Sequence, residues 1–237
     1  MALSRSSIVA GLVGLALGGG AVALASGGGA IGGERARVEQ IVKAYLLEHP
    51  EILPEAMEVL RQRDTSKVVL ANRAAFETPF AGAWAGAEDG DVVLVEFFDY
   101  ACGFCRKSNV DVDRLLAEDK KLKVVWRELP VLGPDSQAAA EVSLAAAKQG
   151  RFKPFYDRLF ASGRPGPQAL AQVRQQFGLS SLSGSPEAQA ELDKNFQLAR
   201  AINASGTPTF VVGDKVLQGA VGYDLLKQAI AEARATS

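Results

Sequence analysis

The sequence predicts an α/β fold in which a block of helices interrupts a small sheet, preceded by a separate helical segment. Three observations support this prediction. Residues 92–98 form a short apolar run rich in β-branched and aromatic residues, typical of a strand buried on both faces. The region from Ser136 to Ala204 has only helical patterns. The chain then returns to two short strands, at residues 209–212 and 215–217.

Residues 1–33 differ in composition from the rest of the chain. Arg5 is the only charged residue before Glu34. Ala23-Leu24-Ala25 has the small-x-small pattern of a signal-peptidase site. We therefore expect residues 1–25 to be an export signal that is cleaved after Ala25.

The alternative for this segment is an uncleaved anchor in the inner membrane. The uncharged run of residues 6–33 is long enough to span a bilayer. Both interpretations place the folded part of the chain beyond the inner membrane. If the source is a Gram-negative bacterium, this location is the periplasm.

Residues 34–76 predict a helical arm. Pro50 ends a first helix, and Pro54 suits the first turn of a second one. The apolar residues of the first helix follow the 3–4 spacing of a single face: Val38, Ile41, Val42, Tyr45 and Leu46. These faces would either fold back on the next domain as a cap or pack against other copies of the chain. The short amphipathic pattern favours an oligomerisation arm.

The proline- and glycine-rich residues 77–90 predict a linker, and residues 91–237 predict the main domain. The elements expected in that domain, in order, are a strand at 92–98, a turn at 99–103, a helix at 105–116, a strand at 123–129, helices at 137–149, 152–160, 168–177 and 186–202, a hairpin of strands 209–212 and 215–217 joined by Gly213-Asp214, and a helix at 223–234.

The two cysteines of the chain, Cys102 and Cys105, flank Gly103 and Phe104 at the start of the predicted helix 105–116. The free N–H groups and the dipole of a helix N-terminus stabilise a thiolate at the first cysteine. A thiolate is the attacking and leaving species in disulfide exchange. The strand, turn and helix around the motif therefore predict a redox pair in which Cys102 reacts with the client and Cys105 resolves the mixed disulfide.

Other functions for the cysteines are less consistent with the sequence. A zinc site normally needs four ligands, and the chain has two cysteines and the distant His49. A disulfide across two residues would constrain very little chain. We therefore expect redox chemistry that needs no metal or organic cofactor. A net charge of −1 gives no electrostatic reason to expect nucleic acid as a partner.

A hypothesis from another class remains open. The chain would then be a non-catalytic periplasmic protein that binds unfolded clients, or Cu(I) through its two thiols.

Glu96 is a carboxylate within the apolar run of residues 92–98. Burial disfavours the charged form, so we expect the pKa of Glu96 to be raised. The alternative is a glutamate at a strand end that is paired or solvated.

Two motifs identify a family resemblance that covers about residues 90–235. Phe97-Phe98-Asp99-Tyr100-x-Cys-x-x-Cys and Gly206-Thr207-Pro208-Thr209-Phe210, with the helical insertion, resemble the DsbA-like branch of the thioredoxin superfamily. The resemblance implies a thioredoxin-like fold with an inserted helical domain at about 136–204. It also implies a protein thiol-disulfide oxidoreductase that acts as an oxidase or an isomerase.

The resemblance also implies roles for individual residues. Pro208 would be cis and face the cysteines, with Thr207 beside it. The backbone of Thr207 would pair with an extended client segment, and Gly103 and Phe104 would lie against the same client. Glu96, six positions before Cys102, would handle the proton of Cys105.

The sequence departs from strongly oxidising family members, which have a histidine between the cysteines. The N-terminal helices resemble those of ScsC-like members, which oligomerise through such arms and shuffle disulfides. The implied partners are client proteins with cysteines, a membrane redox partner, and other copies of the chain bound through residues 34–76. The sequence leaves oxidation, isomerisation and reduction open.

Overall fold

The computed structural model describes residues 29–179 and 185–236. The chain divides between Val59 and Leu60 into two compact units. The expected export signal, residues 1–25, lies outside the described residues, as does most of the alternative anchor at residues 6–33. Within the described ranges, no helix is long and apolar enough to cross a membrane.

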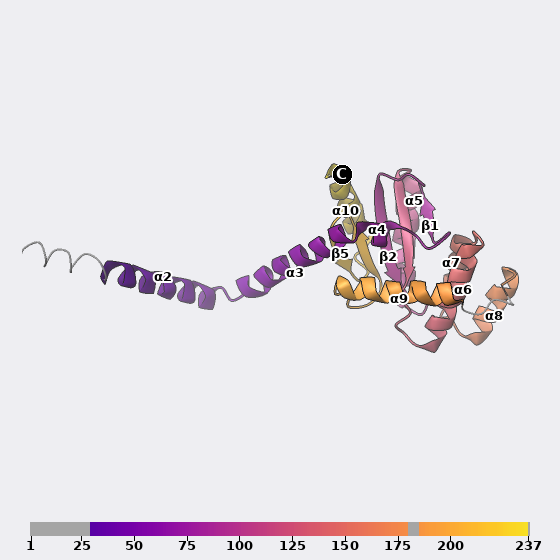
Figure 1. Cartoon of the computed structure of the whole chain (residues 1–237), viewed down its shortest axis with the longest axis horizontal. Helices are drawn as coiled ribbons and strands as arrows, with labels where there is room; N and C mark the ends of the chain where they lie inside the picture. The colour runs from indigo at the N-terminus through magenta and orange to yellow at the C-terminus, as the bar shows by residue number, and fades with distance from the viewer. Residues whose placement is uncertain (1–28, 180–184, 237) are drawn as a thin grey trace, which may run out of the picture. The chain divides into compact units, whose positions relative to one another are not determined.

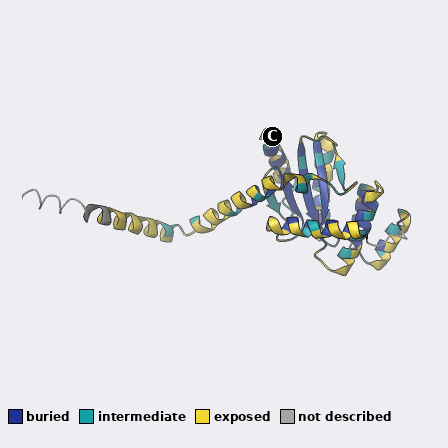
Figure 2. Ribbon diagram, viewed as in Figure 1, coloured by how far each residue is buried: buried dark blue, intermediate teal, exposed yellow. Residues whose placement is uncertain are grey.

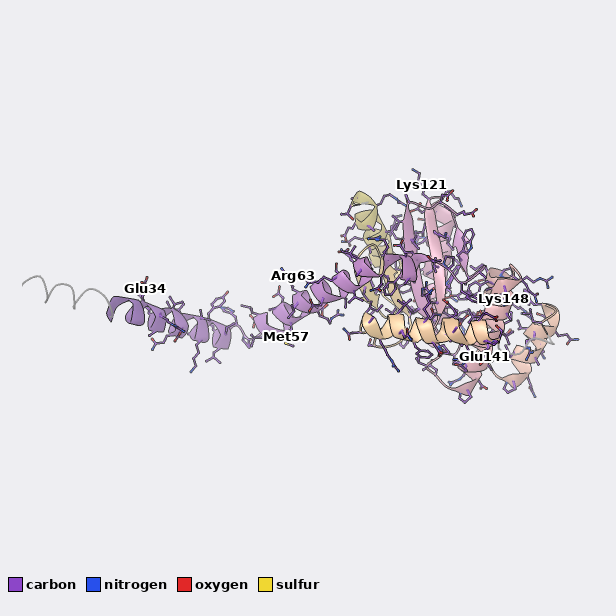
Figure 3. The ribbon with its side chains drawn as sticks, viewed as in Figure 1. Glu34, Met57, Arg63, Lys121, Glu141 and Lys148 are labelled. Carbon is purple, nitrogen blue, oxygen red and sulfur yellow. The ribbon has the colours of Figure 1, made fainter. Side chains whose placement is uncertain are left out.

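The first unit contains helix α2 (Gly29–Glu48) and the start of helix α3 (Ile52–Ala71). Helix α2 ends before Pro50, and Pro54 lies in the first turn of α3, as the proline pattern predicted. Apolar side chains of this unit are largely exposed (Figures 2 and 3): Val38 53%, Ile41 57%, Tyr45 54% and Met57 72%.

The second unit is built on a five-stranded sheet with the order β1-β3-β2-β4-β5 (Figure 1). Its strands are β1 (Trp84–Gly86), β2 (Val92–Phe98), β3 (Leu122–Glu128), β4 (Thr209–Val212) and β5 (Lys215–Gln218). Strands β2 and β3 are parallel and are connected through helix α5 (Gly103–Glu118), while every other pair is antiparallel. This arrangement puts the start of α5 at the carboxyl end of the central strand β2.

Side chains of β2 alternate between two cores, because successive residues of a strand point to opposite faces. Leu94 and Phe98 belong to the core that includes Cys105, whereas Val95 and Phe97 belong to the core on the other face. The first core is covered by α5, α6 (Pro134–Lys148), α7 (Phe152–Ala161) and α10 (Tyr223–Ala235). The second is covered by the end of α3, α4 (Arg73–Glu77) and α9 (Pro186–Ala201).

The helical insertion consists of α6, α7, α8 (Pro167–Gln176) and α9. Its helices begin and end within a few residues of the predicted positions. Helix α7 brings a set of aromatic side chains onto the sheet beside Phe98: Phe152, Tyr156 and Phe160. The contacts of Phe98 with Phe152 and Tyr156 are edge-to-face and stabilise the fold beyond the area that they bury.

The structure corrects the expectation for residues 77–90, which are not linker and loop throughout. Trp84–Gly86 form β1, an edge strand that pairs with β3. Gly86 has a φ of +96°, and a Cβ at this position would lie 2.2 Å from the Leu122 carbonyl oxygen. Three residues without an alternating pattern give no strand signal, so only tertiary pairing reveals this strand.

The expected arm at residues 34–76 also differs from the structure. Residues from Leu60 onward belong to the second unit. Val69 and Phe76 are buried, and the Phe76 ring packs edge-on against Phe97 with 6.2 Å between ring centroids. The last part of the predicted arm is therefore part of the core of the main domain.

A buried arginine holds α4 in this position. Arg127 on β3 donates from Nε to the Phe76 carbonyl oxygen at 2.9 Å and from Nη2 to the Thr78 carbonyl oxygen at 2.8 Å. Its Nη1 donates to Glu191 and Asn195 of α9, both at 2.9 Å. The planar guanidinium thereby connects α4 to α9 across the second core.

Candidate redox site

Helix α5 begins at the redox pair. Cys102 is its N-cap, and the Cys105 backbone N–H donates to Cys102 Sγ at 3.3 Å. Both cysteines are free thiols. Cys102 is 5% exposed and Cys105 is fully buried. Both cysteines are therefore buried, and Cys102 lies nearer to the surface than Cys105.

The surroundings of Cys102 favour its thiolate. A hydrogen bond from the Cys105 thiol is the largest cause, and the backbone N–H groups of Phe104 and Cys105 act in the same direction. Together they lower the pKa of Cys102 from 9.0 to about 5, although burial opposes the change. Cys102 is therefore largely ionised at neutral pH, as a nucleophile in disulfide exchange needs to be.

The surroundings of Cys105 favour its thiol. Burial is the largest cause that raises the pKa of Cys105, followed by the hydrogen bond to Cys102 and the charge of Glu96. Glu96 lies fully buried on the same face of the sheet. Burial raises the pKa of Glu96 to about 8, in the direction that the apolar run predicted.

The Thr207–Pro208 peptide bond is cis, as the family resemblance implied. In its thiol form Cys102 donates to the Thr207 carbonyl oxygen, with 3.3 Å between the two atoms. Pro208 is buried at the start of β4, and its carbonyl oxygen accepts a 2.8 Å hydrogen bond from the Gly219 N–H. The structure thus brings together two motifs that are about a hundred residues apart.

The two residues between the cysteines lie at the surface. Phe104 is 67% exposed, and a Cβ added at Gly103 would meet no atom within 4 Å. An exposed aromatic ring beside a reactive sulfur offers apolar contact area to a bound chain.

Trp126 is a site residue that the sequence analysis missed. Glu96 of β2 pairs with Trp126 of β3 in the parallel register. The Trp126 Nε1–H donates to Glu96 Oε2 at 2.9 Å, whereas Glu96 Oε1 is buried and has no hydrogen-bond partner. A comparison of the two predicted strands residue by residue would have suggested this pair.

Asp99 was also missed as a site residue. Its Oδ1 accepts from the Ala101 N–H at 2.8 Å, within the turn that precedes Cys102. Its Oδ2 accepts from the Val131 and Leu132 N–H groups, both at 2.9 Å. One buried carboxylate therefore joins the cysteine turn to the loop after β3, and those two loop residues expose apolar side chains.

No group of three or more histidine, cysteine, aspartate or glutamate residues in the described part of the chain is arranged to hold a metal ion.

Comparisons with known proteins agree with this geometry. The family described as "DSBA-like thioredoxin domain" matches residues 93–231, and the "Copper resistance protein ScsC N-terminal domain" matches residues 34–65. A linker-deletion mutant of Proteus mirabilis ScsC superposes with a TM-score of 0.73 at 26% identity, over 86% of this chain and 96% of that one. A periplasmic thioredoxin-like protein from Salmonella enterica serovar Typhimurium superposes with a TM-score of 0.64 at 25% identity, over 69% and 95%.

Curated relatives match over shorter parts of their length. Disulfide bond formation protein D of Bacillus subtilis is 26% identical over 163 residues, which cover 61% of this chain and 73% of that protein. A Na⁺/H⁺ antiporter NhaA of Salinispora tropica is 30% identical over 161 residues, or 64% of this chain. The chain spans about a quarter of the length of this antiporter and of the other NhaA antiporters that it matches.

The fold class that the sequence predicted is confirmed: the domain is a thioredoxin-like fold with a helical insertion and an N-terminal helical segment. The match over residues 93–231 covers more than half of the sequence and contains the Cys102–Cys105 pair. The chain therefore belongs to the DsbA-like thioredoxin family, with a match to the ScsC N-terminal domain that precedes the thioredoxin domain in sequence.

Proposed function

We propose that this chain is a thiol-disulfide oxidoreductase that makes or shuffles disulfides in client proteins through Cys102 and Cys105. The geometry of the two sulfurs carries this proposal. Cys102 is the N-cap of α5 and lies beside the cis Thr207–Pro208 bond, whereas Cys105 is fully buried behind it, and their pKa values shift in opposite directions accordingly. A lowered pKa makes Cys102 a thiolate that can attack. A raised pKa keeps Cys105 protonated until it resolves the mixed disulfide.

The exchange proceeds in two balanced steps. The Cys102 thiolate attacks a client disulfide, so that a mixed disulfide forms and the other client sulfur leaves with its electron pair. Cys105 then gives its proton to Glu96 and attacks Cys102 Sγ, which releases the second client sulfur. The client disulfide is reduced and the Cys102–Cys105 pair is oxidised, and the reverse sequence oxidises a client dithiol.

Client recognition in this proposal uses the backbone more than side chains. The cis Thr207–Pro208 segment precedes β4 and lies against Cys102, where an extended client segment would pair with the Thr207 backbone. Gly103 leaves room for that segment, and Phe104 adds apolar contact. Recognition of this kind tolerates many client sequences.

We further propose that the exposed apolar residues of the first unit pack against other copies of the chain. Val38, Ile41, Val42 and Tyr45 follow a helical face and are each at least half exposed. Analytical ultracentrifugation of the chain and of a Val42→Glu variant tests this assembly. A smaller particle for the variant supports it, and a monomeric wild-type chain contradicts it.

The periplasm is the proposed location, supported by the likeness to a periplasmic thioredoxin-like protein and by the N-terminal sequence. A membrane protein that reoxidises or reduces the cysteine pair completes the proposed cycle.

Two assays on the same preparation test the function and its direction. One follows disulfide formation in a reduced client, and the other follows recovery of activity by a client with scrambled disulfides. Titration in glutathione buffers then gives the potential: about −120 mV indicates a disulfide donor, and about −200 mV or below indicates an isomerase or a reductase. Cys102→Ser is the matched control and should be inactive in both assays. A pair with no reversible redox transition would contradict the proposal and favour a protein that binds clients or Cu(I).

A further inference from the structure

An open hollow of 390 Å³ lies beside the cysteine helix, between α5 and α7. It is lined by Arg106, Asn109, Asp113, Asp157, Phe160, Ala161 and Gly163. The carboxylates of Asp113 and Asp157 are 52% and 50% exposed and share Lys153 as an ion-pair partner. The hollow is polar and accessible, so water fills it.

Tyr156 of α7 connects this hollow to the buried site. Its hydroxyl donates to Asn109 Oδ1 at 2.6 Å, at the wall of the hollow. Its ring is buried between Trp126 and Phe98, with centroid distances of 5.1 and 5.0 Å. Phe98 follows Glu96 on the same face of β2, and Trp126 is hydrogen-bonded to Glu96.

Glu96 has few neighbours that can exchange a proton with it. Trp126 only donates its indole N–H and gives no onward path. The titratable and charged groups that act on Glu96 come from α5 and α7: Cys102, Cys105, Asp113 and Tyr156. Glu96 Oε1 is buried without a hydrogen-bond partner, and the Tyr156 hydroxyl lies close enough to lower the pKa of the Glu96 carboxyl.

We propose that Tyr156 relays the proton between Glu96 and water in the hollow between α5 and α7. This inference rests on the proposed proton transfer between Cys105 and Glu96. The Tyr156 ring packs on Trp126 and Phe98, which flank Glu96, and its hydroxyl reaches Asn109 at the wall of the hollow. Asn109 holds this hydroxyl in place and is a positioning residue.

The proton balance follows the direction of exchange. When a client thiolate attacks Cys102 Sγ of the disulfide, the Cys102–Cys105 bond breaks and Cys105 leaves with the electron pair. Glu96 protonates the Cys105 thiolate and becomes a carboxylate. The Tyr156 hydroxyl then turns away from Asn109 Oδ1 and passes its proton to Glu96. It takes a proton from water in the same step and leaves hydroxide in the solvent, because burial raises the pKa of Tyr156 and disfavours a free tyrosinate. When a client disulfide is reduced, the proton of Cys105 moves in the opposite direction, from Glu96 through Tyr156 to water.

Single-turnover kinetics of the reduced full chain with an aromatic disulfide test the relay. A first phase reports attack by Cys102, and a second phase reports resolution by Cys105, since each releases one coloured thiolate. We expect Tyr156→Phe to slow the second phase by about tenfold or more and to leave the first phase within about twofold. The solvent isotope effect on the second phase should change as well.

Tyr100→Phe is the matched control. Tyr100 is as buried as Tyr156 and lies in the same aromatic cluster, but its hydroxyl is 2.7 Å from Ser143. We expect both phases of this variant to stay within about twofold of wild type. Equal slowing in the two phenylalanine variants would indicate a packing effect and overturn the relay.

A double variant separates the relay from simple structural damage. In a Glu96→Gln background, Tyr156→Phe should cause no further slowing, since both residues act in one path. Additive slowing would overturn the relay. If Tyr156→Phe does not fold, Asn109→Leu tests the relay instead. It removes the acceptor of the Tyr156 hydroxyl and fills part of the hollow that holds the water. An unchanged second phase in Asn109→Leu would then overturn the inference. Failure of the wild-type chain to give either phase would contradict the proposed function instead.

Discussion

Cys102 and Cys105 are three positions apart in one helix, yet their surroundings have opposite effects. Backbone N–H groups at the helix start and the neighbouring thiol stabilise charge on Cys102. Cys105 lies on the buried side with Glu96, where burial and a nearby carboxylate disfavour charge. Both residues are cysteines, so the different chemical roles of the two sulfurs follow from their positions at the start of the helix.

The pKa values of the two cysteines also depend on different groups. The lowered pKa of Cys102 depends mainly on the hydrogen bond from the Cys105 thiol. Backbone N–H groups, which any sequence in this conformation supplies, act in the same direction. The raised pKa of Cys105 depends mainly on burial, and then on Cys102 and on the charge of Glu96. Glu96 in turn accepts a hydrogen bond from Trp126 of the neighbouring strand. Substitution of Glu96 should therefore change the pKa of Cys105 more than that of Cys102.

The largest effects are expected from variants that each lack one of the two sulfurs. Cys102→Ser should lose exchange altogether, because no thiolate remains at the accessible position. Cys105→Ser should still attack clients but accumulate mixed disulfides, which mass spectrometry of acid-quenched samples detects. If the two variants accumulated mixed disulfides equally, the assignment of attacking and resolving sulfurs would be wrong.

The second prediction concerns stability against pH. The pKa of Cys102 falls from 9.0 to about 5 in the folded reduced protein, so the unfolded chain binds more protons between these values. Stability of the reduced form should therefore rise with pH from 5 to 9, relative to the oxidised form, which has no thiol to ionise. The gain should be of the order of 3 kcal/mol after solvent screening.

Denaturant unfolding of both redox forms at several pH values measures this difference. Glu96 acts in the opposite sense, because its pKa is raised to about 8 and stability falls as pH rises towards that value. Glu96 is present in both redox forms, so its contribution largely cancels in the comparison. A difference between the forms that did not change with pH would show that Cys102 is not ionised.

The third prediction tests the buried acid. Glu96→Gln keeps the shape and the acceptor for Trp126 but has no proton to exchange. We expect the Cys105 step to slow by about 10²-fold. The wild-type rate of resolution should rise as pH passes about 8, where Glu96 ionises, and this inflection should disappear in the variant. A retained inflection would assign it to another group.

The smallest effect is expected at Asp99. Asp99→Ala leaves the N–H groups of Ala101, Val131 and Leu132 without their acceptor. The cost should be about 1–3 kcal/mol of unfolding free energy. Because the N–H donors to Cys102 remain, the pKa of this thiol, measured by alkylation rate, should stay near about 5. Asp99→Asn is the control, since it keeps one acceptor oxygen and should lose less. A larger loss for the asparagine variant would contradict this account.

The parts of the fold that the sequence predicted have strong local signals. The seven-residue strand β2, the cysteine turn and the alanine-rich helix α6 all show clear periodicity or composition. Burial of Glu96 also followed from its neighbours along the strand. Edge strand β1 has three residues, and its existence depends on pairing with β3. A pairing of that kind leaves no pattern in one sequence.

The candidate site was predictable where the chemistry lies in one motif. Cys102 and Cys105 stand out by spacing, and Pro208 by resemblance. Tyr156 and Asn109 were missed because their 2.6 Å contact joins α7 to α5 across the packed insertion. The division of the predicted arm at Leu60 was missed for a similar reason, since burial of Phe76 depends on the opposite face of the sheet.

Arg127 has a consequence for how the domain opens. Its guanidinium is bonded to backbone oxygens at the end of α4 and to side chains of α9. Detaching either helix would leave the buried charge of Arg127 without some of its partners. Breaking a buried ion pair costs about 3–5 kcal/mol of free energy. Residues 73–77 and 186–201 should therefore unfold as one cooperative unit, with amide hydrogens that exchange at similar free energies although more than a hundred positions separate them.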